Sequence, residues 1–555
     1  MLVMKRKMVS AVTLTLLLAS VLTLAFNVQP VKARGTIYIM ADGSIDPLDA
    51  PISTVDNVTY TLTGNITSDA DGIVVERDNI IIDGASYTVE GTGSWDYKGI
   101  GLEAQNNVTI TNISINGFYY GIWLQDSSNN NLFGNNITDN NSYGIYLQDS
   151  SKNMLRSNNM TDNRDNFWVG GFSLLDYVND VDSSNTVNAQ PLYYWVNRTD
   201  ETIPLDAGYV ALINCTRIAV QNLNLEGNGD GILLAYTTDS KITKNNLTDA
   251  CGIYVWYSSD FNNISGNNVK DSVYGIYLYG SSNHNWISDN NIKNSSYGLW
   301  LLASYQNSII GNNITTNTRF GIRLEYSMGN NIYHNNFIDN VIQVSTDSSG
   351  YANVWDDGYP SGGNYWSDYT GSDFSQGLDQ NTSGSDGIGD SRYGVNANLF
   401  TPPELVQFDN YPLMGQFSDF NPTSEHHAQI ICNSTISDFQ FNETAISFNV
   451  SGENGTAGFC KICIPTALMN ATYKVFVNGT EILYNLLPCS NDTHSYLYFN
   501  YTHSTQEVII IPEFSSFLIL PLFMTATLLA VMVYRRKHTL DNSAVHLSEM
   551  SNPNM

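Results

Sequence analysis

A phrase of about 22 residues recurs along the chain and limits its possible folds more than any other feature. Each copy opens on a glycine followed by alternating apolar residues. These glycines are Gly99, Gly121, Gly144, Gly231, Gly252, Gly275, Gly298 and Gly321. A second motif, a pair of asparagines before an apolar residue, keeps the same spacing. Its copies begin at Asn135, Asn158, Asn245, Asn267, Asn290, Asn312 and Asn335. Two motifs that share one period indicate a solenoid of stacked repeats.

The content of each repeat predicts strands rather than helices. Its apolar stretches are short, rich in β-branched and aromatic residues, and end at Asp-Ser-Ser, Asn-Asn or Gly turns. Such a unit predicts one coil of a parallel β-helix, with successive coils about 4.8 Å apart. Alternate residues then point inward and form apolar ladders, here Ile122, Leu124, Ile145, Leu147, Ile276, Leu278, Ile322 and Leu324. The asparagine pairs are expected at one corner, where a side-chain amide can bond to the next coil.

The predicted fold class is all-β, and the pattern changes mark its parts. We expect the parallel β-helix solenoid over residues 34–345, with an insertion at about 163–206. Residues 346–415, rich in Asp, Gly and aromatic residues, are expected to form a cap with loops. Residues 416–508 alternate apolar and polar residues and predict a small membrane-proximal domain like a β-sandwich. Within the insertion, the aromatic residues 193–195 either line a groove or pack the loop down.

Both ends of the chain carry targeting patterns. Residues 1–33 combine a basic start with an apolar stretch and predict a signal peptide. Residues 512–537 contain an uncharged run, 517–534, followed by the basic residues 535–537. This pattern predicts a transmembrane helix, with residues 538–555 as a cytoplasmic tail. The expected localisation is the cell membrane, with a single pass and an extracellular ectodomain.

The chain is strongly acidic. With 24 Lys and Arg residues against 53 Asp and Glu residues, its formal net charge is −29. Such a surface repels phosphate backbones, so no nucleic-acid partner is expected. About twenty Asn-x-Ser/Thr sequons lie in the expected ectodomain and predict a glycoprotein.

The six cysteines fall into two groups. Cys215 and Cys251 lie among the repeats, and the other four lie near the expected membrane span. These four are Cys432, Cys460, Cys463 and Cys489. In an extracellular domain they predict disulfides in one of three connectivities, with a zinc site as the alternative.

The position two residues after each repeat glycine is expected to face outward, and it is mostly aromatic. The residues there are Trp123, Tyr146, Leu233, Tyr254, Tyr277, Trp300 and Arg323. Trp256 and Tyr279 are expected on the same face. An aromatic stripe can stack on sugar rings, or its rings stabilise neighbouring coils by about 0.2–1 kcal/mol per pair. The candidate carbohydrate-binding residues are therefore Trp123, Tyr146, Tyr254, Trp256, Tyr277, Tyr279 and Trp300.

The sequence offers one candidate metal site and no complete catalytic set. The stretch DQNTSGSDGIGD has the spacing of a Ca²⁺-binding loop. Its candidate ligands are Asp379, Asn381, Ser383 and Asp390. A solvated acidic loop is the alternative.

Asp126 and Asp149 hold equivalent positions in adjacent coils, at a separation that glycosidases use, but both stand in Asp-Ser-Ser turns. No catalytic residue is therefore assigned.

The Gly-Ile-x-Leu and Asn-Asn-Ile coils resemble the right-handed β-helix repeats of the NosD-type family. The resemblance extends over about residues 36–415 and includes GSIDP at 43–47, AGYVALINC at 207–215 and NVWDDGYPSGGNYWSDY at 353–369. It implies a right-handed parallel β-helix within a group of carbohydrate-binding proteins and sugar hydrolases. The last stretch, and a sorting-like Pro-Glu-Phe at 512–514, resemble archaeal cell-surface proteins.

The family is named for periplasmic copper binding, which the residues do not support. The repeats hold only His284, His334 and two separated cysteines, whereas copper sites need clustered His, Met or Cys.

The expected function is binding of carbohydrate or envelope components in a structural or adhesive role. Extracellular glycans or surface-layer proteins are the expected partners. The alternative is an extracellular polysaccharide lyase or glycoside hydrolase.

Overall fold

The computed structural model describes residues 35–513, apart from 94, 250, 348–351, 396–405 and 470–471. The predicted signal peptide, the uncharged run 517–534 and the predicted tail lie outside the described residues. The chain divides into two compact units. The first holds the residues up to Asp357 together with Trp366–Tyr369 and Tyr393–Asn410, and the second holds Gly358–Tyr365, Thr370–Arg392 and the residues from Tyr411 onward.

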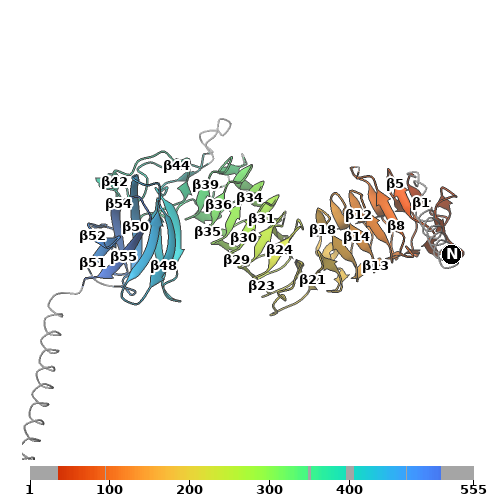
Figure 1. Cartoon of the computed structure of the whole chain (residues 1–555). Coiled ribbons are helices and arrows are strands. Elements are labelled where there is room, and N and C mark those ends of the chain that lie inside the picture. The colour runs from red at the N-terminus through yellow and green to blue at the C-terminus, as the bar shows by residue number, and fades with distance from the viewer. Residues whose placement is uncertain are drawn as a thin grey trace, which may run out of the picture. The chain divides into compact units, whose positions relative to one another are not determined.

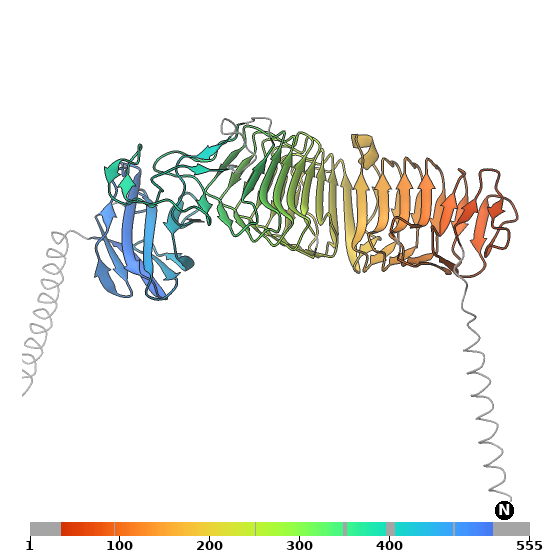
Figure 2. The ribbon, with the colours of Figure 1, turned by 90° about the horizontal axis from the view of Figure 1, so that it is seen from above.

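The first unit is a parallel β-helix, as the repeat predicts (Figure 1, Figure 2). Its first half has three sheets, to which successive coils contribute strands. The sheet with the repeat glycines holds β1 (Ile37–Ile39), β2 (Ile45–Asp46), β6 (Ile73–Val75), β9 (Lys98–Glu103), β12 (Tyr120–Gln125), β15 (Tyr143–Gln148) and β18 (Asp165–Gly170). The second holds β3 (Ile52–Ser53), β4 (Thr59–Leu62), β7 (Ile81–Asp83), β10 (Thr109–Thr111), β13 (Asn131–Phe133), β16 (Met154–Arg156) and β19 (Asp180–Val181). The third holds β5 (Ile66–Ser68), β8 (Thr88–Gly91), β11 (Ser114–Asn116), β14 (Asn136–Thr138), β17 (Asn159–Thr161) and β20 (Thr186–Val187).

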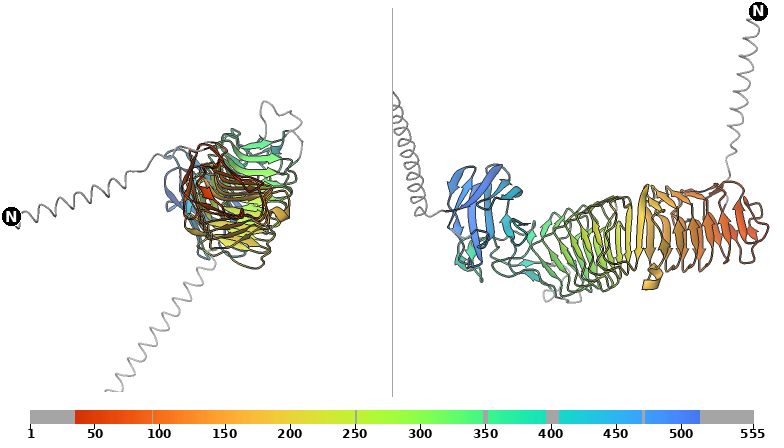
Figure 3. Two further views of the ribbon diagram at one scale, coloured as in Figure 1. Left: turned by 90° about the vertical axis from the view of Figure 1, so that its right-hand side faces the viewer. Right: turned by 90° about the horizontal axis from the view of Figure 1, so that it is seen from below.

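The second half repeats this arrangement (Figure 3). Its repeat-glycine strands are β25 (Ile232–Ala235), β28 (Ile253–Trp256), β31 (Tyr274–Tyr279), β34 (Tyr297–Leu302) and β37 (Phe320–Glu325), flanked by β21 (Gln190–Val196), β22 (Tyr209–Ile213) and β40 (Val344–Thr346). A second sheet holds β23 (Ala219–Gln221), β26 (Lys241–Thr243), β29 (Asn263–Ser265), β32 (Trp286–Ser288), β35 (Ser308–Ile310) and β38 (Asn331–Tyr333). The third holds β24 (Asn224–Glu226), β27 (Asn246–Thr248), β30 (Asn268–Lys270), β33 (Asn291–Lys293), β36 (Asn313–Thr315) and β39 (Asn336–Ile338). A short pair, β44 (Tyr393–Gly394) and β45 (Phe408–Asp409), completes the unit.

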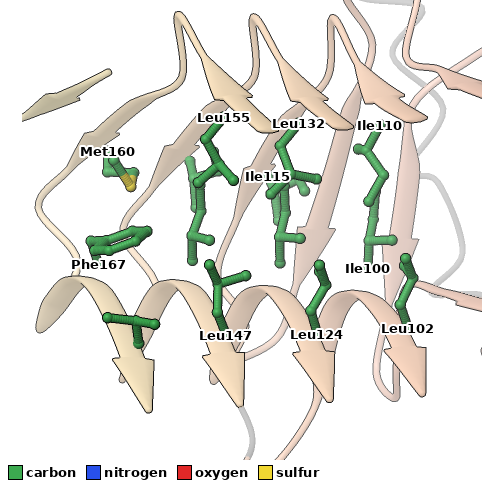
Figure 4. Packing of buried hydrophobic residues seen from close by; sticks show 14 of the residues in the cluster. Ile100, Leu102, Ile110, Ile115, Leu124, Leu132, Leu147, Leu155, Met160 and Phe167 are labelled. Carbon is green, nitrogen blue, oxygen red and sulfur yellow. The ribbon is translucent and has the colours of Figure 1, made fainter. Parts of the chain in front are cut away.

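The predicted apolar ladders form the core. Ile122 pairs with Ile145 and Leu124 with Leu147 across β12 and β15, and all four side chains are fully buried. Figure 4 shows Leu102, Leu124 and Leu147 as successive members of one inward ladder. The period of two along each strand explains this pattern, because alternate side chains of a β-strand point to the same side.

The two halves join where the chain changes sheets. β20 pairs antiparallel with β21, so the repeat-glycine sheet of the second half continues the third sheet of the first half. As a result, the outer face of β22 and β25 lies against the core of the first half. Tyr209, Ala211 and Leu233 belong to that core cluster and are fully buried. The sequence predicted that Leu233 would face outward, and this junction is the reason that it does not.

Much of the expected insertion at 163–206 belongs to the solenoid. β18, β19 and β20 pair in parallel with β15, β16 and β17 of the preceding coil. The departure from the repeat is a 3-10 turn at Leu174–Tyr177 between β18 and β19. Asp165 and Trp168 therefore occupy regular coil positions, opposite Tyr143 and Tyr146.

The first asparagine of each pair is buried and forms a hydrogen-bonded column, as the sequence predicts. Asn267 is representative: its Oδ1 accepts bonds from the backbone N and the Nδ2 of Asn245, both at 3.0 Å. Its own Nδ2 donates to Ile242 O at 2.8 Å and to Asn290 Oδ1 at 2.9 Å. Each amide thus satisfies the backbone of one neighbouring coil and the side chain of the next.

The second unit contains the predicted β-sandwich, built from two antiparallel five-stranded sheets. One holds β46 (Gln416–Phe420), β47 (Ala428–Cys432), β50 (Ala457–Pro465), β54 (His494–Thr502) and β53 (Asn485–Leu486). The other holds β48 (Thr435–Phe441), β49 (Ile446–Ser451), β55 (Gln506–Pro512), β51 (Tyr473–Val477) and β52 (Thr480–Ile482). A short hairpin, β42 (Ser375–Gln376) and β43 (Thr382–Ser383), belongs to the same unit.

One pair of thiols in this sandwich is placed to form a disulfide. Cys432 and Cys460 are direct partners on β47 and β50, and their sulfur atoms are 2.7 Å apart. We expect oxidation of the full chain to remove two free thiols and to raise the free energy of unfolding by about 3.5 kcal/mol, since the bond closes a loop of roughly 28 residues. Thiol titration in denaturant before and after oxidation checks this.

The matched control is Cys215→Ala, which removes a buried thiol of the solenoid. This variant should still lose two thiols on oxidation. In Cys432→Ala, the remaining thiol of the pair, Cys460, should stay free on oxidation. An oxidised wild-type chain that retains all six thiols would contradict the pairing.

The expected localisation needs correction. The described residues contain no helix long and apolar enough to cross a membrane. Their regular elements are short strands and the one 3-10 turn. The expected localisation as a single-pass membrane protein is therefore not supported. The run 517–534, on which that expectation depended, lies outside the described residues.

Candidate functional site

A row of aromatic side chains follows the repeat-glycine strands of the first half. Trp123, Tyr146 and Trp168 are register partners on β12, β15 and β18. The rings of Tyr146 and Trp168 stack with centroids 4.3 Å apart. Lys98 Nζ lies 4.7 Å from the centre of the Trp123 ring at the other end. Three successive coils therefore present one face of rings.

The row continues across the junction onto the second half. Trp168 meets Trp256 with ring centroids 6.5 Å apart. Trp256 lies 6.3 Å from Tyr277, which stacks on Trp300 at 4.9 Å. We call this set the aromatic row: Trp123, Tyr146, Trp168, Trp256, Tyr277 and Trp300.

A pocket of about 280 Å³, which we call the junction pocket, lies where the two halves meet. Its walls are mostly aromatic: Tyr119, Tyr143, Trp168, Tyr254, Trp256, Tyr274 and Tyr277. Its polar lining includes Ser142, Arg164, Asp165 and Asp230. Concave sites with apolar walls and few polar groups are typical of ligand binding.

Two carboxyl groups from opposite halves share this pocket. Asp165 begins β18, and Asp230 lies just before β25. The backbone N of Gly229 donates to Asp165 Oδ1 at 2.7 Å. A Cβ atom at position 229 would lie 2.5 Å from that oxygen, so glycine is what allows this approach. The chain therefore brings the two acids together although 64 residues separate Asp165 from Gly229.

The two acids have different surroundings. Burial raises the pKa of Asp165, but Arg164 and the Gly229 N–H act to lower it. Burial raises the pKa of Asp230 well above its ordinary value, and the charge of Asp165 adds to this effect. Asp230 is only 4% exposed, and no described residue hydrogen-bonds its Oδ2. Asp230 is thus the acid of this pair that holds its proton more firmly.

The structure places the predicted carbohydrate-binding residues on two sheets that meet at the junction, where Tyr254 and Trp256 are buried in the core cluster of the first half. Trp256, Tyr254 and Tyr277 line the junction pocket, and Trp123, Tyr146 and Trp300 extend the row on both sides. Tyr279 lies 6.5 Å from Trp256. Their role in binding stays a prediction.

Sequence reasoning missed Trp168, Asp165 and Asp230. The signal for Trp168 was present, because NFWV at 166–169 matches the apolar alternation of the preceding coils, but assigning it to an insertion hid the match. No local pattern marks the two acids, since they meet only through the junction.

Asp126 and Asp149 have positive φ angles of 51° and 49°, which fits their interpretation as turn residues.

The aromatic residues of the expected insertion both line a groove and pack inward. Tyr193 and Trp195 line a groove of about 760 Å³. Tyr194, between them, also borders this groove. Because side chains alternate along a strand, its ring lies on the other side of β21, where it is buried and donates its hydroxyl proton to Tyr177 O.

The last residue of the candidate Ca²⁺ loop is held by hydrogen bonds from the segment that precedes the loop. Asp390 accepts bonds from Ser372 Oγ at 2.9 Å, Phe374 N at 2.9 Å and Ser375 N at 2.8 Å. Asp379, Asn381 and Ser383 are exposed. Among the described residues, no group of three or more His, Cys, Asp and Glu side chains is placed to hold a metal ion. The Ca²⁺ site stays a prediction that no contact supports.

Copper would need clustered nitrogen or sulfur donors. His284 stacks on the ring of Phe261, and His334 is buried with its ring near Tyr333. The thiols of Cys215 and Cys251 are buried, and burial raises the pKa of both. Over the part of the chain that the structure describes, these donors do not fit a copper centre.

The stacked parallel coils define a β-helix protein, and comparison with protein families agrees. A model described as "Right handed beta helix region" matches residues 52–199, and one described as "Periplasmic copper-binding protein (NosD)" matches residues 194–371. The chain belongs to the NosD-type right-handed β-helix family. These matches do not bear on an archaeal source.

Several solved structures are similar at low identity. The periplasmic alginate epimerase AlgG is 16% identical, with 57% of this chain and 71% of that chain covered and a TM-score of 0.24. The A-module of the Azotobacter vinelandii mannuronan C-5 epimerase AlgE6 is 12% identical, with 53% and 83% covered and a TM-score of 0.24. The Dettilon tailspike protein is 14% identical, with 86% and 93% covered and a TM-score of 0.22. The comparison with curated proteins gave no match. At these values, none of the similar structures defines the function of this chain.

Proposed function

We propose that the chain binds a neutral glycan in the junction pocket and along the aromatic row. The observation that carries this proposal is a pair of buried polar atoms among aromatic walls. Neither Asp230 Oδ2 nor Trp256 Nε1 has a hydrogen-bond partner among the described residues. Both side chains line the junction pocket.

The aromatic row supplies the apolar part of such a site. Trp168, Tyr277 and Trp300 are half-buried, so their rings are partly accessible. The C–H face of a sugar ring packs well on the face of an aromatic ring, while the hydroxyl groups stay free to form hydrogen bonds. A row across several coils suits a chain of sugars rather than a single one.

Asp230 Oδ2 and Trp256 Nε1 supply the hydrogen-bonding groups that would make binding specific. Leaving a buried donor or acceptor without a partner costs about 1–3 kcal/mol. A sugar hydroxyl both donates and accepts, so it matches the acceptor Asp230 Oδ2 as well as the donor Trp256 Nε1. Binding would then remove a cost that the free protein carries.

The charge of the site selects a neutral glycan. The pocket lining carries two acids, Asp165 and Asp230, against one base, Arg164. The whole chain has a formal net charge of −29. A polymer of uronates or sulfated sugars would be repelled over its whole length.

A glycan array probed with the full chain tests the proposal. We expect signals on neutral oligosaccharides and weaker or absent signals on their uronate or sulfated counterparts of equal length. Titration calorimetry with the best binder gives the affinity, and methyl glycosides of the same sugars test how many units are needed. Binding confined to anionic glycans, or to none, would refute the proposal.

A further inference from the structure

A row of hydrogen-bonded polar side chains in the β-sandwich ends at the thiol pair Cys432 and Cys460. Cys432 Sγ lies 3.2 Å from the hydroxyl oxygen of Tyr501, which lies 2.6 Å from Ser434 Oγ. Ser434 Oγ in turn lies 2.7 Å from His503 Nε2. Ser434 and His503 are buried, whereas Tyr501 is half-buried. We call Tyr501, Ser434 and His503 the polar row.

One backbone carbonyl fixes the direction of every bond in the polar row. Thr456 Oγ1 donates its single proton to Glu453 O at 2.7 Å, so it can only accept from His503 Nδ1, which is 2.6 Å away. His503 Nε2 must then accept from Ser434, whose oxygen accepts from Tyr501. The proton of the Tyr501 hydroxyl is thereby used, so its oxygen accepts from the nearby thiol. Each donor therefore points from the thiol towards His503.

Two glycines leave room for the ring of His503. A Cβ atom at Gly452 would lie 2.6 Å from His503 Cδ2. One at Gly458 would lie 2.8 Å from the same atom and 2.4 Å from Tyr501 Cε2. The titratable groups that the described residues place next to this ring are Tyr501, 5.8 Å away between centroids, the thiols at the end of the row, and the exposed Glu453. The imidazole therefore has a site of its own beside the thiol pair.

The two thiols have different surroundings. Burial acts to raise the pKa of Cys432, but hydrogen bonds from Cys460, Tyr501 and Ser434 outweigh it and lower that pKa. Burial raises the pKa of Cys460 well above its ordinary value, and the neighbouring Cys432 adds to this effect. Since the thiolate is the reactive form, Cys432 is the better nucleophile of the pair.

We propose that Cys432 and Cys460 form a dithiol that reduces hydroperoxides, with Cys432 as the attacking thiol and His503 as the final acceptor of its proton. Nucleophilic thiols are commonly activated by a histidine that takes the proton. Here Tyr501 contacts the thiol, and His503 acts through the polar row as a positioning residue. This activity belongs to the sandwich and is independent of glycan binding by the solenoid.

The reaction balances with a hydroperoxide as the oxidant. Cys432 passes its proton to Tyr501, Tyr501 passes its own to Ser434, and Ser434 passes its own to His503 Nε2. The thiolate then attacks one oxygen of hydrogen peroxide and breaks the O–O bond, which leaves a sulfenic acid on Cys432. The departing hydroxide takes a proton back along the row and becomes water. The sulfur of Cys460 attacks the sulfenic sulfur, and its proton leaves with the hydroxyl group as a second water. Two electrons pass from the two sulfur atoms to the peroxide.

The test measures how fast hydrogen peroxide converts the reduced pair of the full chain into a disulfide. Samples are quenched by alkylation over a range of pH, and the Cys432–Cys460 disulfide is quantified by mass spectrometry. A protonated imidazole cannot accept the thiol proton, so the wild-type rate should rise while histidines titrate, between about pH 5 and 8, and then level off. An unassisted thiol is only about 3% ionised at pH 7. Ser434→Ala and Tyr501→Phe should therefore react roughly tenfold more slowly at that pH and keep accelerating up to about pH 8.5.

Ser437→Ala is the matched control, because the Ser437 hydroxyl is on β48, is exposed, and bonds to Asp438 outside the polar row. It should keep the wild-type rate and pH profile. If Ser434→Ala and Tyr501→Phe both keep the wild-type profile, His503 is not the proton acceptor. If the reduced pair in the folded chain does not react with peroxide, the whole proposal fails. Circular dichroism shows whether each variant is folded, and should Ser434→Ala not fold, Tyr501→Phe provides the same comparison.

Discussion

Replacing Asn267 by alanine is expected to lower the free energy of unfolding by about 4 kcal/mol. The substitution removes four side-chain hydrogen bonds inside a buried column. The backbone N of Asn245 and the carbonyl of Ile242 would then lose partners in a place that water does not reach. Each such group costs about 1–3 kcal/mol, and alanine supplies no replacement.

The neighbouring residue Asn268 is the matched control. It stands in the outer asparagine column, is half-buried, and donates to Asn246 Oδ1 at 2.6 Å. Because water can replace its bonds, Asn268→Ala should cost less than about 1 kcal/mol. Denaturant unfolding followed by circular dichroism checks both variants, and hydrogen exchange at Asn245 locates the effect. Similar costs for the two variants would show that burial of the inner column is not what stabilises the coils.

The second large effect is expected in binding. Trp168→Ala should weaken the affinity for the best neutral glycan by about 30-fold, which corresponds to about 2 kcal/mol. Trp168 stacks on Tyr146 and contacts Trp256, so it connects the two parts of the aromatic row. Its removal interrupts the row at the point where the junction pocket opens.

Trp286→Ala provides the control for this prediction. Trp286 is 47% exposed on β32, a strand of a different sheet, and it does not line the junction pocket. Calorimetry on both variants should show wild-type affinity for Trp286→Ala only. Wild-type affinity in both variants would show that the glycan binds elsewhere. A comparable loss in both would point to a general effect of removing a tryptophan.

The sequence itself determined the coil and its core. Two motifs with one period predicted parallel stacking, and Ile122 over Ile145 confirms it. The buried asparagine column was equally readable, because an amide at the same corner of every coil can bond only to its equivalents above and below. These features are local and repeated, so each copy strengthens the inference from the others.

The junction was decided by the tertiary structure. Leu233 has the same sequence context as the outward residues of other coils, yet it is buried because its coil packs against the first half. The same change of sheets brings Asp165 to the backbone N of Gly229, beside Asp230. A repeat predicts what lies one period away, whereas contact across 64 residues depends on how one stack ends against the next. That dependence is the physical reason why the core could be predicted and the pocket could not.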